Sequence, residues 1–400
     1  MTKKRVQANS TNANEVRVRW PESAFALPKD IFHREDVYRL ELERIFYGPD
    51  WHPLAHVAEI PNRGDFKSFR LGEVPVLIVH GDDDQIRVFA NSCTHRGTQL
   101  ETHALGNKKE FECPYHRWLF DNRGTLVAAP GSDCFPVNFR KQDYSLRELR
   151  CDQFLGLIFA TCDQSAPDLD SYLGEMKELI AKAMGGDGRL KLLGYQKVCF
   201  DSNWKEYQDN DGYHAPLLHR AFQLLRWQAG TGRAVATRFG HMGIEANLKE
   251  LANASFLSDP SIVEFKQENV PLTSIAMGLF PITVIVKHLD VINLRFALPR
   301  SVDETEVHYA YFCHQDDSEE MMTHRLRQSS NLLGPSGFIS LEDGSVFNRL
   351  HVGSNTFGDI MYQKGVDSLH GEPPYSLQQN DEAANVVKWK HYTELMGFAR

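Results

Sequence analysis

Two short segments of the sequence combine cysteine and histidine at the spacing of metal ligands. One residue separates Cys93 from His95, and two residues separate Cys113 from His116. Thiolate and imidazole bind soft or borderline metals, so zinc and iron–sulfur are the candidates. In a Rieske [2Fe-2S] cluster two cysteines bind one iron and two histidines bind the other, and each segment supplies one ligand of each type. The spacing by itself is also compatible with a zinc site.

A second pair of histidines lies further along the chain. His214 and His219 are five residues apart, which would place them about 140° apart on a regular α-helix. Pro216 lies between them and disrupts helical hydrogen bonding, so a broken helix would allow both rings to point at one ion. Two unrelated histidines are the alternative that this spacing leaves open.

The composition of the chain narrows its class. With 400 residues, 42% hydrophobic and 24% charged, we expect a soluble protein of two domains. A net charge of −9 without a concentrated basic stripe argues against nucleic-acid binding. No apolar run is long enough to cross a membrane, and residues 1–19 lack the apolar core of a signal peptide, so they should form a flexible arm. Seven cysteines without a framework favour a reducing cytoplasm over a disulfide scaffold.

The order of the expected elements predicts an α+β protein. Residues 1–51 should form an N-terminal arm and a helix (30–47) that packs on the larger domain. Short β-rich runs separated by Gly, Pro and Asp predict a small all-β domain over 52–165, with both Cys/His segments on its loops. Residues 166–400 should form a larger domain in which helices cover an antiparallel sheet. Its helices are expected at 168–184, at 203–230 with an interruption, at 318–334 and at 383–397, and its strands within 272–313.

The neighbours of these residues resemble a known family. Cys93-Thr-His-Arg-Gly and Cys113-Pro-Tyr-His-Arg-Trp resemble the C-x-H-R-G and C-P-Y-H-x-W motifs of Rieske domains. The segment from Asn203-Trp-Lys to Asp-Gly-Tyr-His214-Ala-Pro-Leu-Leu-His219 resembles the iron-binding signature of the large (α) subunits of Rieske non-heme iron ring-hydroxylating oxygenases. The resemblance extends from about residue 30 to the end of the chain.

The resemblance implies a ligand set for two metal centres. Cys93, His95, Cys113 and His116 would hold a Rieske [2Fe-2S] cluster. His214, His219 and a distant carboxylate would hold a mononuclear Fe(II) and leave positions on it open for dioxygen. The segment Gly334-Pro-Ser-Gly-Phe-Ile-Ser-Leu-Glu-Asp-Gly resembles the one that supplies the carboxylate, and it selects Asp343, with Glu342 as the alternative.

By the same resemblance, Asp211 would hydrogen-bond His214 and reach the Rieske His116 of a neighbouring subunit, which would couple the two centres electronically. The family members compared have two more residues between the Glu-Asn-like pair and this aspartate. The shorter segment here leaves open an exchange of roles among Asp209, Asn210 and Asp211.

The resemblance also implies an activity and partners. It is nearest to oxygenases that act on aromatic carboxylic acids of the benzoate, salicylate and terephthalate kind, by dihydroxylation or hydroxylation. Arg295 corresponds to an arginine that binds the substrate carboxylate in the terephthalate-oxidising members, although a structural ion pair is an alternative. Further pocket candidates are Asn210, His288 and Asn293.

No nicotinamide or flavin fingerprint is found, because Gly185–Gly188 does not follow a strand. Electrons should therefore come from an NAD(P)H-dependent reductase, with or without a ferredoxin. The chain should act in the cytoplasm as an α3 trimer or with a small β subunit as α3β3. A monooxygenase or demethylase shares these metal sites. A Rieske electron carrier, which binds two irons rather than three, and a colourless zinc-binding interaction protein are the alternatives from other classes.

Overall fold

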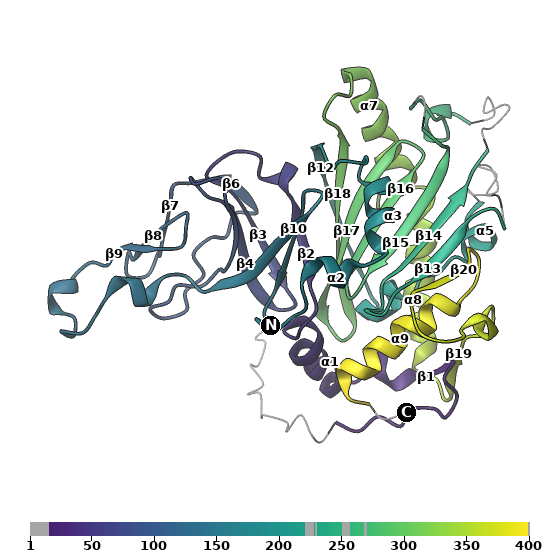
Figure 1. Ribbon diagram of the computed structural model, residues 1–400, viewed down its shortest axis with the longest axis horizontal. Helices are drawn as coiled ribbons and strands as arrows, with labels where there is room; N and C mark the ends of the chain where they lie inside the picture. The colour runs from purple at the N-terminus through teal and green to yellow at the C-terminus, as the bar shows by residue number, and fades with distance from the viewer. Residues whose placement is uncertain (1–15, 221–227, 229, 250–256, 268–269, 399–400) are drawn as a thin grey trace.

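The protein was analysed as a computed structural model, which describes residues 16–220, 228, 230–249, 257–267 and 270–398. It has two lobes (Figure 1). The N-terminal lobe is an all-β unit and the larger lobe is a sheet covered by helices, so the predicted α+β class is confirmed.

The smaller lobe is built from two antiparallel sheets. A seven-stranded sheet has the order β2 (His52–His56), β11 (Leu157–Thr161), β10 (Glu148–Phe154), β5 (Ile86–Ala90), β4 (Val74–His80), β3 (Asp65–Leu71) and β6 (Leu105–Asn107). A three-stranded sheet contains β7 (Glu110–Glu112), β8 (Leu119–Asp121) and β9 (Leu126–Ala128). Its core is a separate cluster that includes Phe66, Phe111 and Phe120.

The larger lobe contains one eight-stranded antiparallel sheet. Its order is β12 (Leu190–Phe200), β18 (Glu304–His314), β17 (Val291–Ser301), β16 (Thr283–His288), β15 (Thr273–Leu279), β14 (Met242–Asn247), β13 (Arg233–Ala236) and β20 (Tyr375–Gln378). The helices around it are α2 (Leu169–Leu173), α3 (Met176–Ala183), α4 (Trp204–Gln208), α5 (Ala215–Leu218), α7 (Glu319–Gln328), α8 (Ser340–Ser354) and α9 (Ala383–Met396). Helix α3 packs on β14 to β16, whereas α4 and α8 contact β17 and β12.

The alternation of side chains along β17 and β18 creates two different faces. Leu294 and Phe296 of β17 point into the main hydrophobic core, while Arg295 and Ala297 point to the opposite face. Arg295 pairs in register with Tyr309 of β18, which shares its face. Because side chains alternate with a period of two, one face of this sheet can be wholly apolar while the other carries polar groups.

Several predicted helices have different bounds. The helix expected at 168–184 is divided into α2 and α3 at Gly174, whose φ of 46° lies in the left-handed region. The first α-helix, α1 (Glu35–Glu41), begins five residues after Asp30, because residues 29–32 form a 3-10 turn. Within the described part of 203–230 the chain forms two short helices, α4 and α5, and residues 221–227 and 229 lie outside the described residues. Helix α8 was not predicted, since its Gly and Ser residues have low helix propensity.

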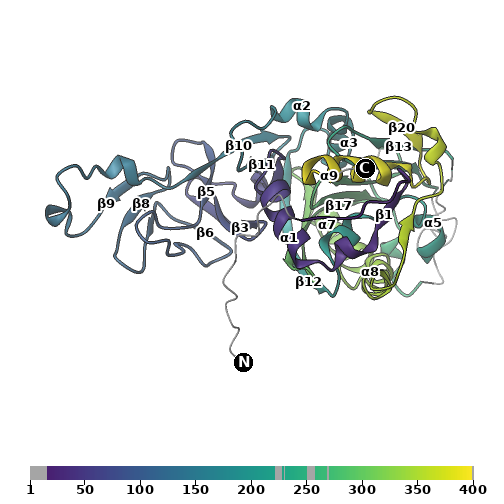
Figure 2. The ribbon, with the colours of Figure 1, turned by 90° about the horizontal axis from the view of Figure 1, so that it is seen from below.

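The N-terminal segment packs on the larger lobe. Helix α1 continues into a π-helical turn (Leu42–Phe46), which contacts α9 (Figure 2). Strand β1 (Ala26–Pro28) pairs with β19 (Asp359–Met361). Glu41 is fully buried, accepts hydrogen bonds from Trp204 Nε1 (2.9 Å) and Tyr392 Oη (2.6 Å), and pairs with Lys205 Nζ at 2.7 Å. This carboxylate therefore joins the N-terminal segment to α4 and α9.

We expect Glu41→Gln to lower the free energy of unfolding by about 3–5 kcal/mol, because it leaves the buried ammonium of Lys205 without its counter-ion. Chemical denaturation of the variant measures this loss. Asp143→Asn, which breaks the exposed ion pair with Arg140, is the matched control and should change stability by less than about 0.5 kcal/mol. An equal effect of the two substitutions would contradict the role of the buried pair.

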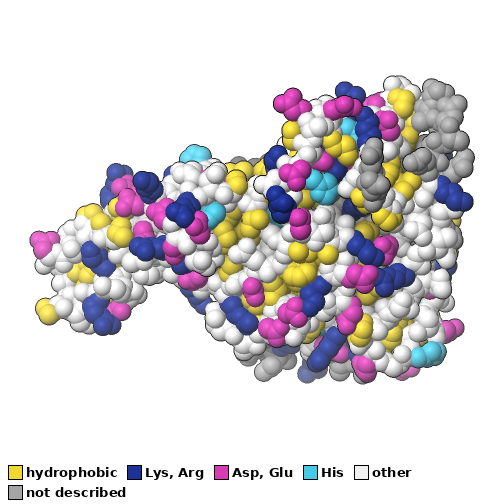
Figure 3. Space-filling model, turned by 45° about the horizontal axis from the view of Figure 1, so that its top comes forward, with side chains coloured by type: hydrophobic (Ala, Val, Ile, Leu, Met, Phe, Trp, Pro, Cys, Tyr) yellow, Lys and Arg dark blue, Asp and Glu magenta, His cyan; other side chains and the backbone are white. Residues whose placement is uncertain are grey.

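On the face seen in Figure 3, positively charged Lys and Arg side chains are interspersed with negatively charged Asp and Glu, and neither charge covers a large continuous area. Among the described residues, no helix combines the length and apolar character that crossing a bilayer requires.

Candidate active site

The two Cys/His segments form neighbouring loops in the smaller lobe. In each loop a backbone hydrogen bond closes the turn: Cys93 N donates to Thr98 O and Cys113 N donates to Trp118 O, both at 2.8 Å. Both cysteines are buried, whereas His95 is exposed and His116 half-buried. The two imidazole rings lie 4.6 Å apart between centroids, and the His95 ring stacks on Trp118 at 4.7 Å. The cysteines are thus inside and the histidines at the rim.

Backbone N–H groups also point at the sulfur atoms. Burial raises the pKa of the Cys93 thiol, and the adjacent Cys113 adds to this effect. At Cys113 burial also acts to raise the pKa, but the N–H groups of Tyr115 and His116 outweigh it and lower the pKa of that thiol. A site that stabilises one thiolate in this way is suited to a metal.

The geometry of the four Cys and His side chains favours a [2Fe-2S] cluster over a single zinc ion. One zinc ion bound by all four side chains at about 2.0–2.3 Å would bring their ligand atoms within about 4 Å of one another. Among the residues that the structure describes, the groups of three or more His, Cys, Asp or Glu with ligand atoms within 4.8 Å of one another do not include these four. A [2Fe-2S] cluster holds its cysteine pair and its histidine pair on different irons, so the residues fit this group.

A second set of ligand-type side chains converges in the larger lobe. His214 Nε2 lies 3.6 Å and His219 Nε2 3.3 Å from Asp343 Oδ1, and the ligand atoms of the three residues lie within 4.8 Å of one another. His214 precedes the four-residue helix α5, and His219 leaves it with an extended backbone (φ −83°, ψ 106°). The five-residue spacing therefore works because the helix ends before His219. Two imidazoles and one carboxylate facing one point fit a mononuclear iron with open positions.

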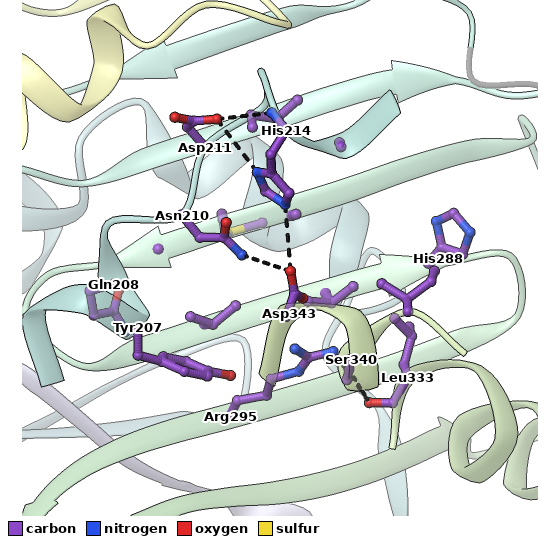
Figure 4. A pocket seen from close by; sticks show the side chains of 18 of the residues that line it. Tyr207, Gln208, Asn210, Asp211, His214, His288, Arg295, Leu333, Ser340 and Asp343 are labelled. Carbon is purple, nitrogen blue, oxygen red and sulfur yellow. Dashed lines mark hydrogen bonds and ion pairs between the residues drawn. The ribbon is translucent and has the colours of Figure 1, made fainter. Parts of the chain in front are cut away.

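Each of these histidines has a carboxylate at its other ring nitrogen. Asp211 Oδ1 lies 3.5 Å from His214 Nδ1, and Glu342 Oε2 lies 3.1 Å from His219 Nδ1 (Figure 4 shows the first pair). Such partners fix the tautomer and direction of a metal-binding imidazole. Glu342, the alternative to Asp343 in the sequence, is thus placed behind His219 and not beside both rings. Its role as the partner of His219 was missed, and no signal in the sequence distinguishes it.

The ionisation of the triad suits a cation. Burial acts to raise the pKa of Asp343, but its hydrogen bond with His219 outweighs burial, and the pKa of Asp343 is lowered. Burial acts to lower the pKa of His219, but Asp343 and Glu342 raise it. Asp343 is therefore held as a carboxylate, the form that binds a metal ion, and a bound cation would replace a proton on His219 as its positive partner.

The three polar residues before His214 have separate positions. The carboxylate of Asp209 accepts hydrogen bonds from Lys388 Nζ (2.8 Å), Trp389 Nε1 (2.8 Å) and Tyr362 Oη. All three partners belong to the C-terminal part of the chain, so Asp209 does not contact the histidines. Asn210 Nδ2 lies 3.4 Å from Asp343 Oδ1, and Asp211 contacts His214.

Gly212 is needed in this segment, because a Cβ atom there would lie 1.9 Å from Gln379 O. The close approach of the two backbones fixes the turn between Asp211 and His214.

A cavity adjoins the His/His/Asp set. It has a volume of about 980 Å³ including the space open at its mouth, and mainly apolar side chains from β14 to β17, α4 and α8 line it. Arg295, His288 and Asn210 are among the lining residues (Figure 4). Burial lowers the pKa of His288 to about 3, so this ring is neutral. Asn293 is not among the residues that line the cavity. Its Oδ1 accepts a hydrogen bond from Arg295 Nε at 2.5 Å, so Asn293 lies behind the arginine, and the pocket position predicted for it is wrong.

Arg295 is a buried cation at the wall of this cavity. Besides Asn293, its contacts include Leu333 O, 3.4 Å from Nη2, the side chain of Tyr207, and the ring of Tyr309, whose centroid lies 4.9 Å from the guanidinium carbon. Burial acts to lower the pKa of Arg295, but the adjacent tyrosines raise it, so the group is charged. Within the described part of the chain no Asp or Glu oxygen lies within ion-pair distance of its guanidinium, although its charge contributes to lowering the pKa of the nearby Asp343.

The likeness to known proteins agrees with this geometry. Residues 50–145 match the model of the Rieske [2Fe-2S] domain, and residues 187–385 match that of the ring hydroxylating alpha subunit (catalytic domain). The large subunit of anthranilate 1,2-dioxygenase from Burkholderia cepacia is 31% identical over 93% of both chains. Subunit alpha 2 of the terminal oxygenase component of terephthalate 1,2-dioxygenase from Comamonas sp. is 33% identical over 76% of this chain and 80% of its own.

The large oxygenase component of salicylate 5-hydroxylase from Ralstonia sp. is 30% identical over 82% of this chain and 85% of its own. The crystal structure of naphthalene 1,2-dioxygenase from Rhodococcus sp. shares the fold with a TM-score of 0.82 and 25% identity, covering 94% of this chain and 95% of that one. Fold and sites together define a Rieske oxygenase. The chain belongs to the ring-hydroxylating oxygenase α-subunit family, with a Rieske [2Fe-2S] domain and a catalytic domain that binds mononuclear iron.

Proposed function

We propose that this chain is the α subunit of a terminal oxygenase that uses O2 and externally supplied electrons to dihydroxylate or hydroxylate an aromatic carboxylic acid. The observation that carries the proposal is the buried Arg295, which lines the cavity beside the His/His/Asp set and forms no ion pair within 4 Å with an Asp or Glu among the described residues, while its charge also acts on Asp343. A buried guanidinium is stabilised by a bound carboxylate, which it grips with two hydrogen bonds. The relatives named for anthranilate, terephthalate and salicylate support the same substrate class.

The proposal assigns roles to the residues described above. Cys93, His95, Cys113 and His116 would hold the cluster, and His214, His219 and Asp343 would hold the iron. When bound, the cluster supplies electron transfer and the iron supplies activation of O2. The chain itself does the rest: Arg295 orients the acid, Asn210 and His288 line its position, and the apolar wall excludes water.

The proposed division of the chain is an N-terminal arm and helix (1–51), a Rieske domain (52–165) and a catalytic domain (166–400). Figures 1 and 2 place strands β7 to β9 and helix α5 at opposite ends of the molecule. This arrangement supports transfer of electrons from the cluster of a neighbouring subunit, in an α3 trimer or with a small β subunit in α3β3. An NAD(P)H-dependent reductase, with or without a ferredoxin, would supply the electrons. None of the seven cysteines forms a disulfide, which supports a cytoplasmic location.

A turnover screen tests the proposed function. The purified oxygenase, with a reductase and NADH, is incubated with aromatic acids and their uncharged amides, and the molecular masses of the products are measured by mass spectrometry. We expect acids to be consumed and amides to react poorly. A mass gain of two oxygens and two hydrogens indicates a diol, whereas a gain of one oxygen indicates hydroxylation, the second candidate that the salicylate 5-hydroxylase likeness favours. Consumption of uncharged arenes in preference to acids would contradict the assigned substrate class.

Asp211 is proposed as a positioning residue that couples His214 to His116 of a neighbouring subunit. Asp211→Asn should slow oxidation of the prereduced cluster in a single turnover by about 10–100-fold, while the iron content and the visible spectrum stay unchanged. Stopped-flow absorbance measures the rate. Asp201→Asn, at an exposed position on the same segment, is the control and should not change it. An unchanged rate in Asp211→Asn would remove the coupling role.

A further inference from the structure

Another group of two histidines and one carboxylate lies outside the cavity. It consists of His33, Asp303 and His351, whose ligand atoms all lie within 4.8 Å of one another. His33 follows a 3-10 turn (Lys29–Phe32), Asp303 lies in the turn between β17 and β18, and His351 belongs to α8. The 3-10 turn packs against α8, so segments from three parts of the chain meet here. Neither the proposed reaction nor the Rieske site uses these residues.

The spacing of this group matches that of the proposed iron ligands. His351 Nε2 lies 3.2 Å and His33 Nδ1 3.8 Å from Asp303 Oδ1. The corresponding distances from His219 and His214 to Asp343 are 3.3 and 3.6 Å. An ion about 2.0–2.2 Å from each ligand atom fits both sets equally well.

The outer nitrogen of each ring is already held by another group. His351 Nδ1 lies 2.8 Å from Glu206 Oε2, and His33 Nε2 lies 2.8 Å from Ser354 Oγ. Ser354 Oγ in turn donates to Glu206 Oε1 at 2.9 Å, so one buried carboxylate supports both rings. When the outer nitrogens donate, the inner nitrogens present lone pairs toward Asp303. Metal-binding histidines are commonly held in this way by a carboxylate behind the ring.

The electrostatics agree with this geometry. Burial, with help from the neighbouring His351, lowers the pKa of His33. The side chain of Asp303 is 65% exposed, which leaves a path for an ion from solvent. A metal-free alternative is a hydrogen-bonded network in which the ring of His351 bridges Glu206 and Asp303.

We propose that His33, Asp303 and His351 bind a divalent transition-metal ion of the Zn²⁺ class, with its remaining position open to solvent. Two imidazoles and one carboxylate favour zinc over Mg²⁺ or Ca²⁺, which prefer oxygen ligands. The ion would tie the N-terminal segment and the turn after β17 to α8. His351 follows Asp343 by eight residues on this helix, about 12 Å along its axis, so the ion would brace the helix that carries the proposed iron ligand.

Equilibrium dialysis of the iron-loaded enzyme against micromolar Zn²⁺ tests the proposal, with zinc and iron counted by elemental analysis. We expect the wild type to take up one zinc per chain without losing iron, and to melt about 5 °C higher when zinc is saturating. His33→Ala and Asp303→Asn should each weaken zinc binding at least about tenfold and abolish the rise in Tm. Asp303→Asn changes a mainly exposed side chain, so this variant should fold even if His33→Ala does not.

The controls separate this site from other zinc-binding positions. His370→Ala removes an exposed histidine elsewhere and should bind zinc as the wild type does. Excess Mg²⁺ should not displace the zinc. Equal zinc uptake by the wild type, His33→Ala and Asp303→Asn would overturn the proposal, as would zinc uptake matched by loss of iron. No uptake at all would also overturn the proposal and would leave the metal-free hydrogen-bonded network. Because iron content is measured separately, these outcomes do not depend on the proposed substrate.

Discussion

His214→Ala is expected to abolish oxygenase turnover while the Rieske cluster remains intact. His214 Nε2 is one of three ligand-type atoms that face the same point, so its removal leaves His219 and Asp343 alone. Two ligands do not retain an iron that exchanges with solvent, and the chain should keep the irons of the cluster and lose the mononuclear one. Iron analysis, the visible spectrum of the cluster and turnover with a reductase measure the three parts of this prediction.

The two neighbouring carboxylates provide a sharper comparison. Asp343→Asn should lose the mononuclear iron as His214→Ala does, because Asp343 Oδ1 faces both rings. Glu342→Gln should retain the iron with an affinity weakened about 10–100-fold, because Glu342 contacts His219 from behind. Full iron content and activity in His214→Ala, or a greater loss in Glu342→Gln than in Asp343→Asn, would contradict the proposed ligand set.

Arg295→Met is expected to lower kcat/KM for an aromatic acid by about 30-fold to 5,000-fold, which corresponds to about 2–5 kcal/mol. The substitution keeps much of the side-chain volume in a buried position but removes the charge that faces the cavity. A substrate carboxylate would then be buried without a partner. Steady-state kinetics over a range of acid concentrations measure the loss.

The uncharged amide of the same acid is the control for this prediction. Arg295→Met should reduce the preference of the enzyme for the acid over the amide, while iron content stays unchanged. Arg295→Lys keeps the charge but not the planar fork, so its activity should be intermediate. If Arg295→Met lowered the activity toward acid and amide equally, the arginine would act in packing beside Tyr309 rather than in recognition of the carboxylate.

Most of the architecture was accessible from the sequence because its signals are local. The short β-rich runs predicted within 52–165 include Val74–His80 and Ile86–Ala90, which form β4 and β5, and the C-terminal helix expected at 383–397 is α9. The four Cys and His residues of the Rieske motifs lie within two turns, where spacing along the chain nearly fixes spacing in space. The sequence predicted a broken helix around Pro216, but Pro216 lies in the first turn of α5, where proline is tolerated, and the two histidines converge because this helix ends at Leu218.

The remaining assignments depend on how elements pack. Asp343 and Glu342 are equivalent by sequence, yet consecutive residues of a helix point about 100° apart, so the packing of α8 against α4 and β12 decides which one faces the histidines. The sequence likewise left open whether Asp209 or Asp211 contacts His214. The structure assigns this role to Asp211, because the carboxylate of Asp209 is held by Lys388 of α9.

The sequence therefore determined the ligand types, the fold class and the family resemblance, because these follow from residue identity and short spacing. Only the tertiary structure decided that Glu342 lies behind His219 and that Asn293 lies behind Arg295. It also brought His33, Asp303 and His351 together, because contacts between residues far apart in the chain are set by packing, which local pattern does not encode.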